Sequence, residues 1–124
     1  MAQILVVDDD WTIRDLVGDV LEYDGFAVRT AGNGEEALQQ VRASKPDGIV
    51  LDLMMPVMDG RAFAERCHGD ELCRDTPIIV MSAAHDFHAA AQRLQAFGVR
   101  AVVAKPFDMD ALVALVERYV AAVN

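Results

Sequence analysis

Ile4-Leu5-Val6-Val7-Asp8-Asp9-Asp10 joins four apolar residues to three carboxylates near the start of a 124-residue chain. A short apolar run that ends in charged residues predicts a strand buried on both faces, as a parallel sheet requires. Similar runs recur, each followed by a segment with apolar residues three and four positions apart. The sequence therefore predicts five strands, at residues 4–7, 26–30, 48–51, 78–81 and 101–104.

A helix is expected after each strand. Asp9 or Asp10 can cap the first helix, which Gly25 closes, and Asn33 can cap the second. The other three are expected at about residues 61–68, at roughly 87–97 and from near Asp108. This alternation predicts an α/β fold, a (βα)5 doubly wound five-stranded parallel sheet, and the length predicts a single domain over residues 1–124.

Composition and charge exclude several classes of protein. Hydrophobic residues make up 53% of the chain, which is enough for a packed core. A net charge of −9 disfavours direct contact with nucleic acid or an anionic membrane. No apolar stretch approaches the roughly 18 residues of a membrane span, and no basic secretory leader is present, so we expect a cytoplasmic protein. Cys67 and Cys73 lack metal-ligand spacing and are expected to be free thiols.

Polar residues collect where the predicted strands end. Asp8 and Asp9 follow the first strand, Asp52 the third, Ser82 the fourth and Lys105 the fifth. Each alone is a common solvated loop residue. Together they should converge, because the sites of open α/β sheets lie outside the carboxyl ends of the strands. Clustered carboxylates repel one another unless a cation such as Mg²⁺ joins them. A lysine and a hydroxyl beside them suit phosphoryl transfer, in which a carboxylate can be the nucleophile.

Four segments resemble the signature of response-regulator receiver domains of two-component signalling, of the chemotaxis-regulator kind. They occur in the family's order and together span nearly the whole chain: Val6–Asp10, Asp52–Gly60, Met81–Ala83 and Ala104–Phe107. The resemblance implies a flavodoxin-like strand order, 2-1-3-4-5. It also implies a phosphoacceptor domain of a two-component or phosphorelay system that switches conformation to control an output partner. Such a domain is not a turnover enzyme, although it promotes its own phosphorylation and dephosphorylation.

The resemblance assigns roles at the acidic residues. Asp52 corresponds to the phosphoacceptor, which takes its phosphoryl group from a histidine kinase or a histidine phosphotransfer protein. Asp8 and Asp9 correspond to the acidic pair that holds Mg²⁺, together with Asp52 and the backbone carbonyl of Met54. Asp10 is expected to cap a helix instead.

The remaining roles fall on the last two strands. Ser82 corresponds to the hydroxyl residue that moves toward the phosphoryl group, and Lys105 to the lysine that pairs with it. The family's usual aromatic switch position is Val102 here, so a rotating ring cannot report phosphorylation. The implied partners are the kinase or phosphotransfer protein, an unknown output protein or domain, and a second copy in a phosphorylation-dependent homodimer.

Three other functions compete with this interpretation. Asp8-x-Asp10 resembles the nucleophile and acid of haloacid-dehalogenase-like phosphohydrolases, a reading that leaves Asp52 without a role. A flavodoxin-type flavin module would share the strand order, yet three aspartates would repel the flavin phosphate. A degenerate receiver that only binds proteins is disfavoured because every key polar position is filled.

Overall fold

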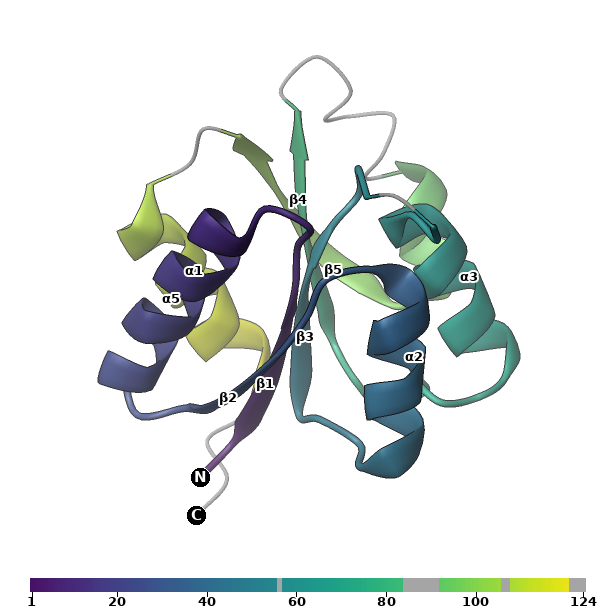
Figure 1. Cartoon of the computed structure of the whole chain (residues 1–124), viewed down its shortest axis with the longest axis horizontal. Coiled ribbons are helices and arrows are strands. Elements are labelled where there is room, and N and C mark those ends of the chain that lie inside the picture. Colours follow the sequence, from purple (N-terminus) through teal and green to yellow (C-terminus); the bar gives the residue numbers. More distant parts are fainter. Residues whose placement is uncertain (56, 84–91, 106–107, 121–124) are drawn as a thin grey trace.

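The chain folds around one parallel sheet of five strands (Figure 1). The computed structural model describes residues 1–55, 57–83, 92–105 and 108–120. Within them the strands are β1 (Gln3–Val7), β2 (Ala27–Ala31), β3 (Gly48–Asp52), β4 (Ile78–Ala83) and β5 (Val99–Lys105). Their order in the sheet is β2-β1-β3-β4-β5, which confirms the predicted order.

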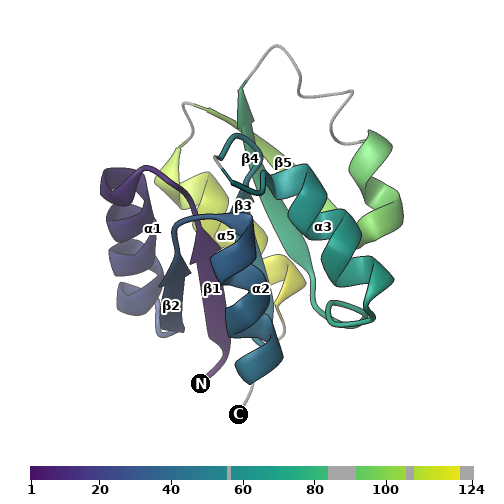
Figure 2. The same cartoon turned by 45° about the vertical axis from the view of Figure 1, so that its right-hand side comes forward.

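Helices cover both faces of the sheet (Figures 1 and 2). One face carries α1 (Trp11–Tyr23) and α5 (Met109–Tyr119), and the other carries α2 (Gly34–Ala43) and α3 (Gly60–Gly69). Of the helix predicted at 87–97, residues 87–91 lie outside the described residues. Residues 92–94 are helical, and η2 (Gln95–Phe97) is a 3-10 helix.

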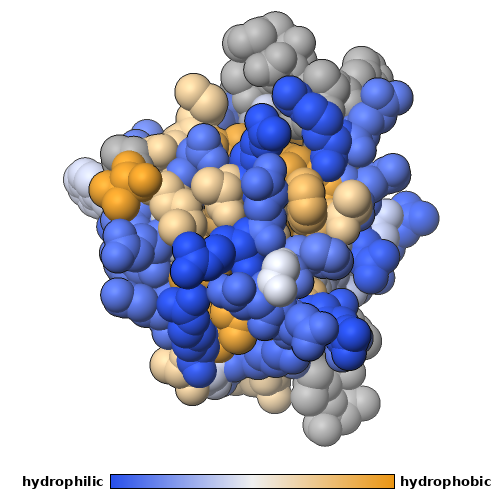
Figure 3. All heavy atoms as spheres, turned by 90° about the vertical axis from the view of Figure 1, so that its right-hand side faces the viewer, coloured by the Kyte–Doolittle hydropathy of each residue, from blue (hydrophilic) through white to orange (hydrophobic). Residues whose placement is uncertain are grey.

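Each face of the sheet has its own apolar core. Leu5, Leu51 and Val80 point toward α2 and α3, whereas Val6, Val50 and Ile79 point toward α1 and α5. Successive residues of β1, β3 and β4 point to opposite faces of the sheet, and nearly all of them are buried. This is expected for a sheet that is covered on both sides. The outer surface over α2 and α3 is mostly hydrophilic, and its apolar side chains form small separate groups (Figure 3).

Side chains predicted to cap helices do so. The Asp10 carboxylate accepts from the backbone N–H of Thr12 at 3.0 Å and caps α1, while Gly25 follows that helix with a φ of 102°. Asn33 Oδ1 accepts from Glu36 N and caps α2. These caps fix where the loops at the carboxyl edge of the sheet turn into helices.

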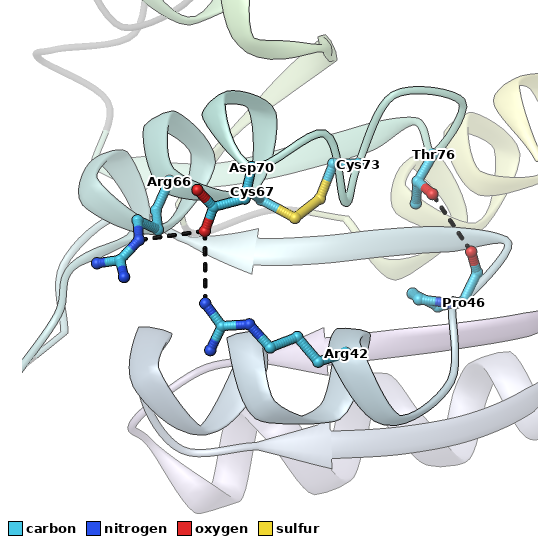
Figure 4. Close-up of a disulfide and its surroundings, with 7 residues drawn as sticks. All are labelled: Arg42, Pro46, Arg66, Cys67, Asp70, Cys73 and Thr76. Carbon is cyan, nitrogen blue, oxygen red and sulfur yellow. Dashed lines mark hydrogen bonds and ion pairs between the residues drawn. A yellow bond between two sulfur atoms is a disulfide. The ribbon is translucent and has the colours of Figure 1, made fainter.

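The prediction that Cys67 and Cys73 are free thiols is wrong, because they form a disulfide (Figure 4). Cys67 lies in the last turn of α3, and the turn that follows brings the two Cα atoms to 5.3 Å. Both residues are buried. Beside them, Asp70, which directly follows α3, pairs with Arg66 of that helix and with Arg42 of α2.

Strand β4 extends further than the sequence pattern indicated. Ser82 and Ala83 pair with Ala104 and Lys105, so Ser82 lies within the strand and not after it.

Among the described residues, no helix is long and apolar enough to cross a membrane.

Candidate functional site

Three carboxylates meet at the carboxyl edge of the central strands. Strands β1 and β3 are neighbours, and Val7 pairs with Leu51, so the chain places Asp8 beside Asp52. One oxygen each from Asp8, Asp9 and Asp52 lies within 4.8 Å of the others. Asp8 and Asp52 are buried, whereas Asp9 is exposed. The cluster therefore consists of two buried carboxylates and one carboxylate that is open to solvent.

Lys105 joins this cluster from the end of β5. Its Nζ lies 3.2 Å from Asp8 Oδ2 and 3.4 Å from Asp52 Oδ1. Strand β4 separates β5 from β3, so the long lysine side chain reaches across one strand to both carboxylates. An ammonium with two buried acidic partners offsets part of their mutual repulsion.

Backbone groups hold the two buried carboxylates in place. Asp10 N donates to Asp8 Oδ1 at 2.9 Å, and Met54 N donates to Asp52 Oδ1 at 3.2 Å. Arg14 Nη1 donates to the backbone carbonyl of Asp8 at 3.2 Å. The contact from Arg14 was absent from the sequence prediction, since it depends on how the first turn of α1 folds back over the end of β1.

The pKa of Asp52 is raised to about 6. Burial is the main cause, and the neighbouring Asp8 carboxylate adds to it, while Lys105 and the Met54 N–H act in the opposite direction. A bound cation would favour the ionised form.

The other predicted residues surround this cluster. Ser82 is buried on β4, one residue beyond Met81, which pairs with Asp52. The side chain of Met54 is exposed. Val102 is half-buried and packs against the core on the side of α2 and α3. The structure thus groups Asp8, Asp9, Asp52 and Lys105 by direct distances and places Ser82 on the adjoining strand.

The donor set suits a hard cation. The three groups are carboxylates, which Mg²⁺ prefers, and the exposed Asp9 leaves room for the waters that this ion retains. Asp8, Asp9 and Asp52 are therefore able to hold Mg²⁺ together with water.

Comparison with known proteins identifies the class. The family model described as the response regulator receiver domain matches residues 4–117. The chain belongs to this family, and its acidic cluster is consistent with a phosphoacceptor site.

Individual relatives agree with this assignment. Response regulator MprA of Mycobacterium tuberculosis is 36% identical over 113 residues, which cover 91% of this chain and 48% of MprA. The chain thus spans about half the length of the curated relatives it matches.

Three solved structures match this chain over nearly their full length. Chemotaxis protein CheY4 of Vibrio cholerae is 32% identical with a TM-score of 0.87, covering 96% of this chain and 98% of that one. A putative response regulator from Chloroflexus aurantiacus is 34% identical with a TM-score of 0.88 and 98% coverage of both chains. Response regulator protein TrrA of Thermotoga maritima, solved in complex with Mg²⁺ and BeF, is 31% identical with a TM-score of 0.82, covering 96% and 99%.

Proposed function

We propose that Asp52 is the phosphoacceptor of this receiver domain. The observation that carries the proposal is the position of Asp52: it is buried at the end of the central strand, 3.4 Å from Lys105 and beside Asp8. Its ionised oxygen attacks the phosphorus of the donor, a P–O bond forms, and the bond from phosphorus to the donor nitrogen breaks. The electron pair of that bond stays on the donor imidazole.

Mg²⁺ is the proposed cofactor, held by Asp8, Asp9, Asp52 and the backbone carbonyl of Met54. When bound, it supplies positive charge that offsets the charge of the carboxylates and of the incoming phosphoryl oxygens. The complex of the relative TrrA with Mg²⁺ and BeF supports this choice of ion.

The neighbouring side chains have separate proposed roles. Lys105 pairs with a phosphoryl oxygen, because its ammonium already lies between the two buried carboxylates. The hydroxyl of Ser82 donates to another oxygen of the same group. With valine at position 102, the conformational change is proposed to run through the backbone around Ser82.

The proposed phosphoryl donor is a histidine kinase or a histidine phosphotransfer protein. The proposed target is an output protein or domain, with a phosphorylation-dependent homodimer as its assembly. The curated relatives are about twice as long as this chain, which supports an output domain in the same polypeptide. A cytoplasmic location is part of the proposal, and the net charge of −9 argues against direct contact with nucleic acid or an anionic membrane.

Acetyl phosphate with Mg²⁺ tests the proposal without a partner protein. Intact-mass measurement should show the gain of one phosphoryl group in the wild type, and none in Asp52→Asn or when EDTA replaces Mg²⁺. The matched control is Asp59→Asn, which alters an exposed aspartate in the following loop and retains a residue able to cap α3. Its mass gain should equal that of the wild type.

The same samples separate the competing functions. A phosphohydrolase would release phosphate continuously from a generic phosphomonoester, whereas a receiver should not. Phosphorylation of Asp52→Asn at the wild-type level would overturn the assignment of the acceptor.

A further inference from the structure

Arg14 lies between two loops at the edge of the acidic site. It is in the first turn of α1, is half-buried, and donates through Nη1 to the carbonyl oxygen of Asp8 at 3.2 Å. That carbonyl belongs to the peptide bond that joins Asp8 to Asp9. The guanidinium therefore acts on the backbone between two proposed metal ligands, not on either carboxylate.

The loop between β2 and α2 closes the other side of the guanidinium. A methyl group at Gly32 would lie 2.9 Å from Arg14 Nη1 and 3.7 Å from Glu36 Oε2. The first distance is closer than such contacts normally come. The lack of a side chain at Gly32 is thus what leaves space for Arg14 to reach Asp8. The start of this loop is also held close to Asp8, since Asp8 N donates to the carbonyl of Ala31, the last residue of β2.

We propose that Arg14 is a positioning residue, whose contact with the Asp8 carbonyl, in the space left by Gly32, sets the Asp8–Asp9 backbone for cation binding. The inference rests on the proposed function of the acidic cluster. Arg14 touches neither the ion nor the phosphoryl group in this role. It acts through the peptide bond, as residues that orient metal ligands commonly do.

A positioning role and a purely electrostatic role predict opposite changes in Mg²⁺ affinity when Arg14 is removed. Loss of a positive charge beside an acidic cluster should strengthen the binding of a cation. Loss of a positioning contact should weaken it, typically by tenfold or more. The direction of the change in Mg²⁺ affinity therefore distinguishes the two roles.

Mg²⁺ titrations without any phosphoryl donor test the proposal. Trp11 is the only tryptophan and lies two residues after Asp9, so we expect its fluorescence to change when the ion binds. In Arg14→Met we expect the Mg²⁺ dissociation constant to rise about tenfold. Gly32→Ala keeps every charge and displaces the guanidinium, so it should raise the same constant, while Arg14→Lys should restore part of the affinity.

Two controls make the result decisive. Arg74→Met removes one exposed positive charge between α3 and the start of β4, at the edge of the sheet opposite the acidic cluster, and should leave the Mg²⁺ affinity unchanged. In the Arg14→Met background, Gly32→Ala should cause no further loss, because the group it displaces is gone. Circular dichroism verifies that each variant is folded.

The outcomes are separable from those of the proposed function. If the wild type binds no Mg²⁺ and gains no phosphoryl mass, the proposed function fails. If the wild type does both, but folded Arg14→Met binds Mg²⁺ as tightly as the wild type or more tightly, the positioning role of Arg14 is overturned.

Discussion

At the scale of single residues, the free energy of unfolding depends on whether Asp52 is protonated. Its pKa is about 6 in the folded chain, against an ordinary value of 3.8. An acid whose pKa is raised by folding contributes stability below its unfolded pKa, and that contribution is lost as the pH rises through the folded value. Above pH 6 the ionised carboxylate therefore destabilises the metal-free protein.

Asp52→Asn should thus stabilise the metal-free protein at pH 7.5, by roughly 1 to 3 kcal/mol, since one pKa unit corresponds to about 1.4 kcal/mol. The gain should shrink to about half at pH 5, where much of the wild-type Asp52 is already protonated. Thermal or urea unfolding in EDTA at both pH values measures it, with Asp59→Asn as the control. A gain that is equal at the two pH values would show that ionisation of Asp52 is not its cause.

At the scale of elements, the strands and their polar ends were predictable, because buried parallel strands produce apolar runs and Asp8, Asp52 and Lys105 directly follow or end them. The end of β4 was not, since the pairing of Ser82 with Ala104 depends on the neighbouring strand. The spacing of Cys67 and Cys73 in the sequence also did not predict their disulfide. Their approach depends on the turn after α3, which no periodicity encodes. The same holds for Arg14, whose partner lies in a loop.

The disulfide should stabilise the junction of α3 and β4. Its closed loop is short, with a sequence separation of 6, so loop-closure entropy accounts for about 2 kcal/mol. Complete reduction, verified by thiol titration, should lower the free energy of unfolding by that amount and the melting temperature by several degrees.

The double variant Cys67→Ala and Cys73→Ala serves as the control, because its melting temperature should not respond to the reductant. Equal stability of the oxidised and fully reduced wild type would contradict the expected contribution. Glutathione and thioredoxin keep most thiols of the cytoplasm reduced. The stability of the reduced protein is therefore the value that applies at the proposed cytoplasmic location.

At the scale of the whole molecule, ion binding at one edge of the sheet should stabilise the entire domain. A ligand that binds only the folded state adds about 2.7 kcal/mol at one hundred times its dissociation constant. Saturating Mg²⁺ should therefore raise the melting temperature, and Asp9→Ala should greatly reduce that rise because it removes the exposed carboxylate of the proposed ligand set. Glu117→Ala, an exposed acidic residue on α5, should retain the full increase. A rise in Asp9→Ala as large as in the wild type would place the ion elsewhere.

The pairing of both cysteines also makes the chain convenient for spectroscopy. The protein has two cysteines, and the disulfide between Cys67 and Cys73 leaves no free thiol. A maleimide dye should therefore not react with the oxidised wild type and should attach only to a cysteine that is introduced by substitution. Tyr23→Cys, at a side chain that is 95% exposed, would give one labelled position on α1, with the native disulfide left in place.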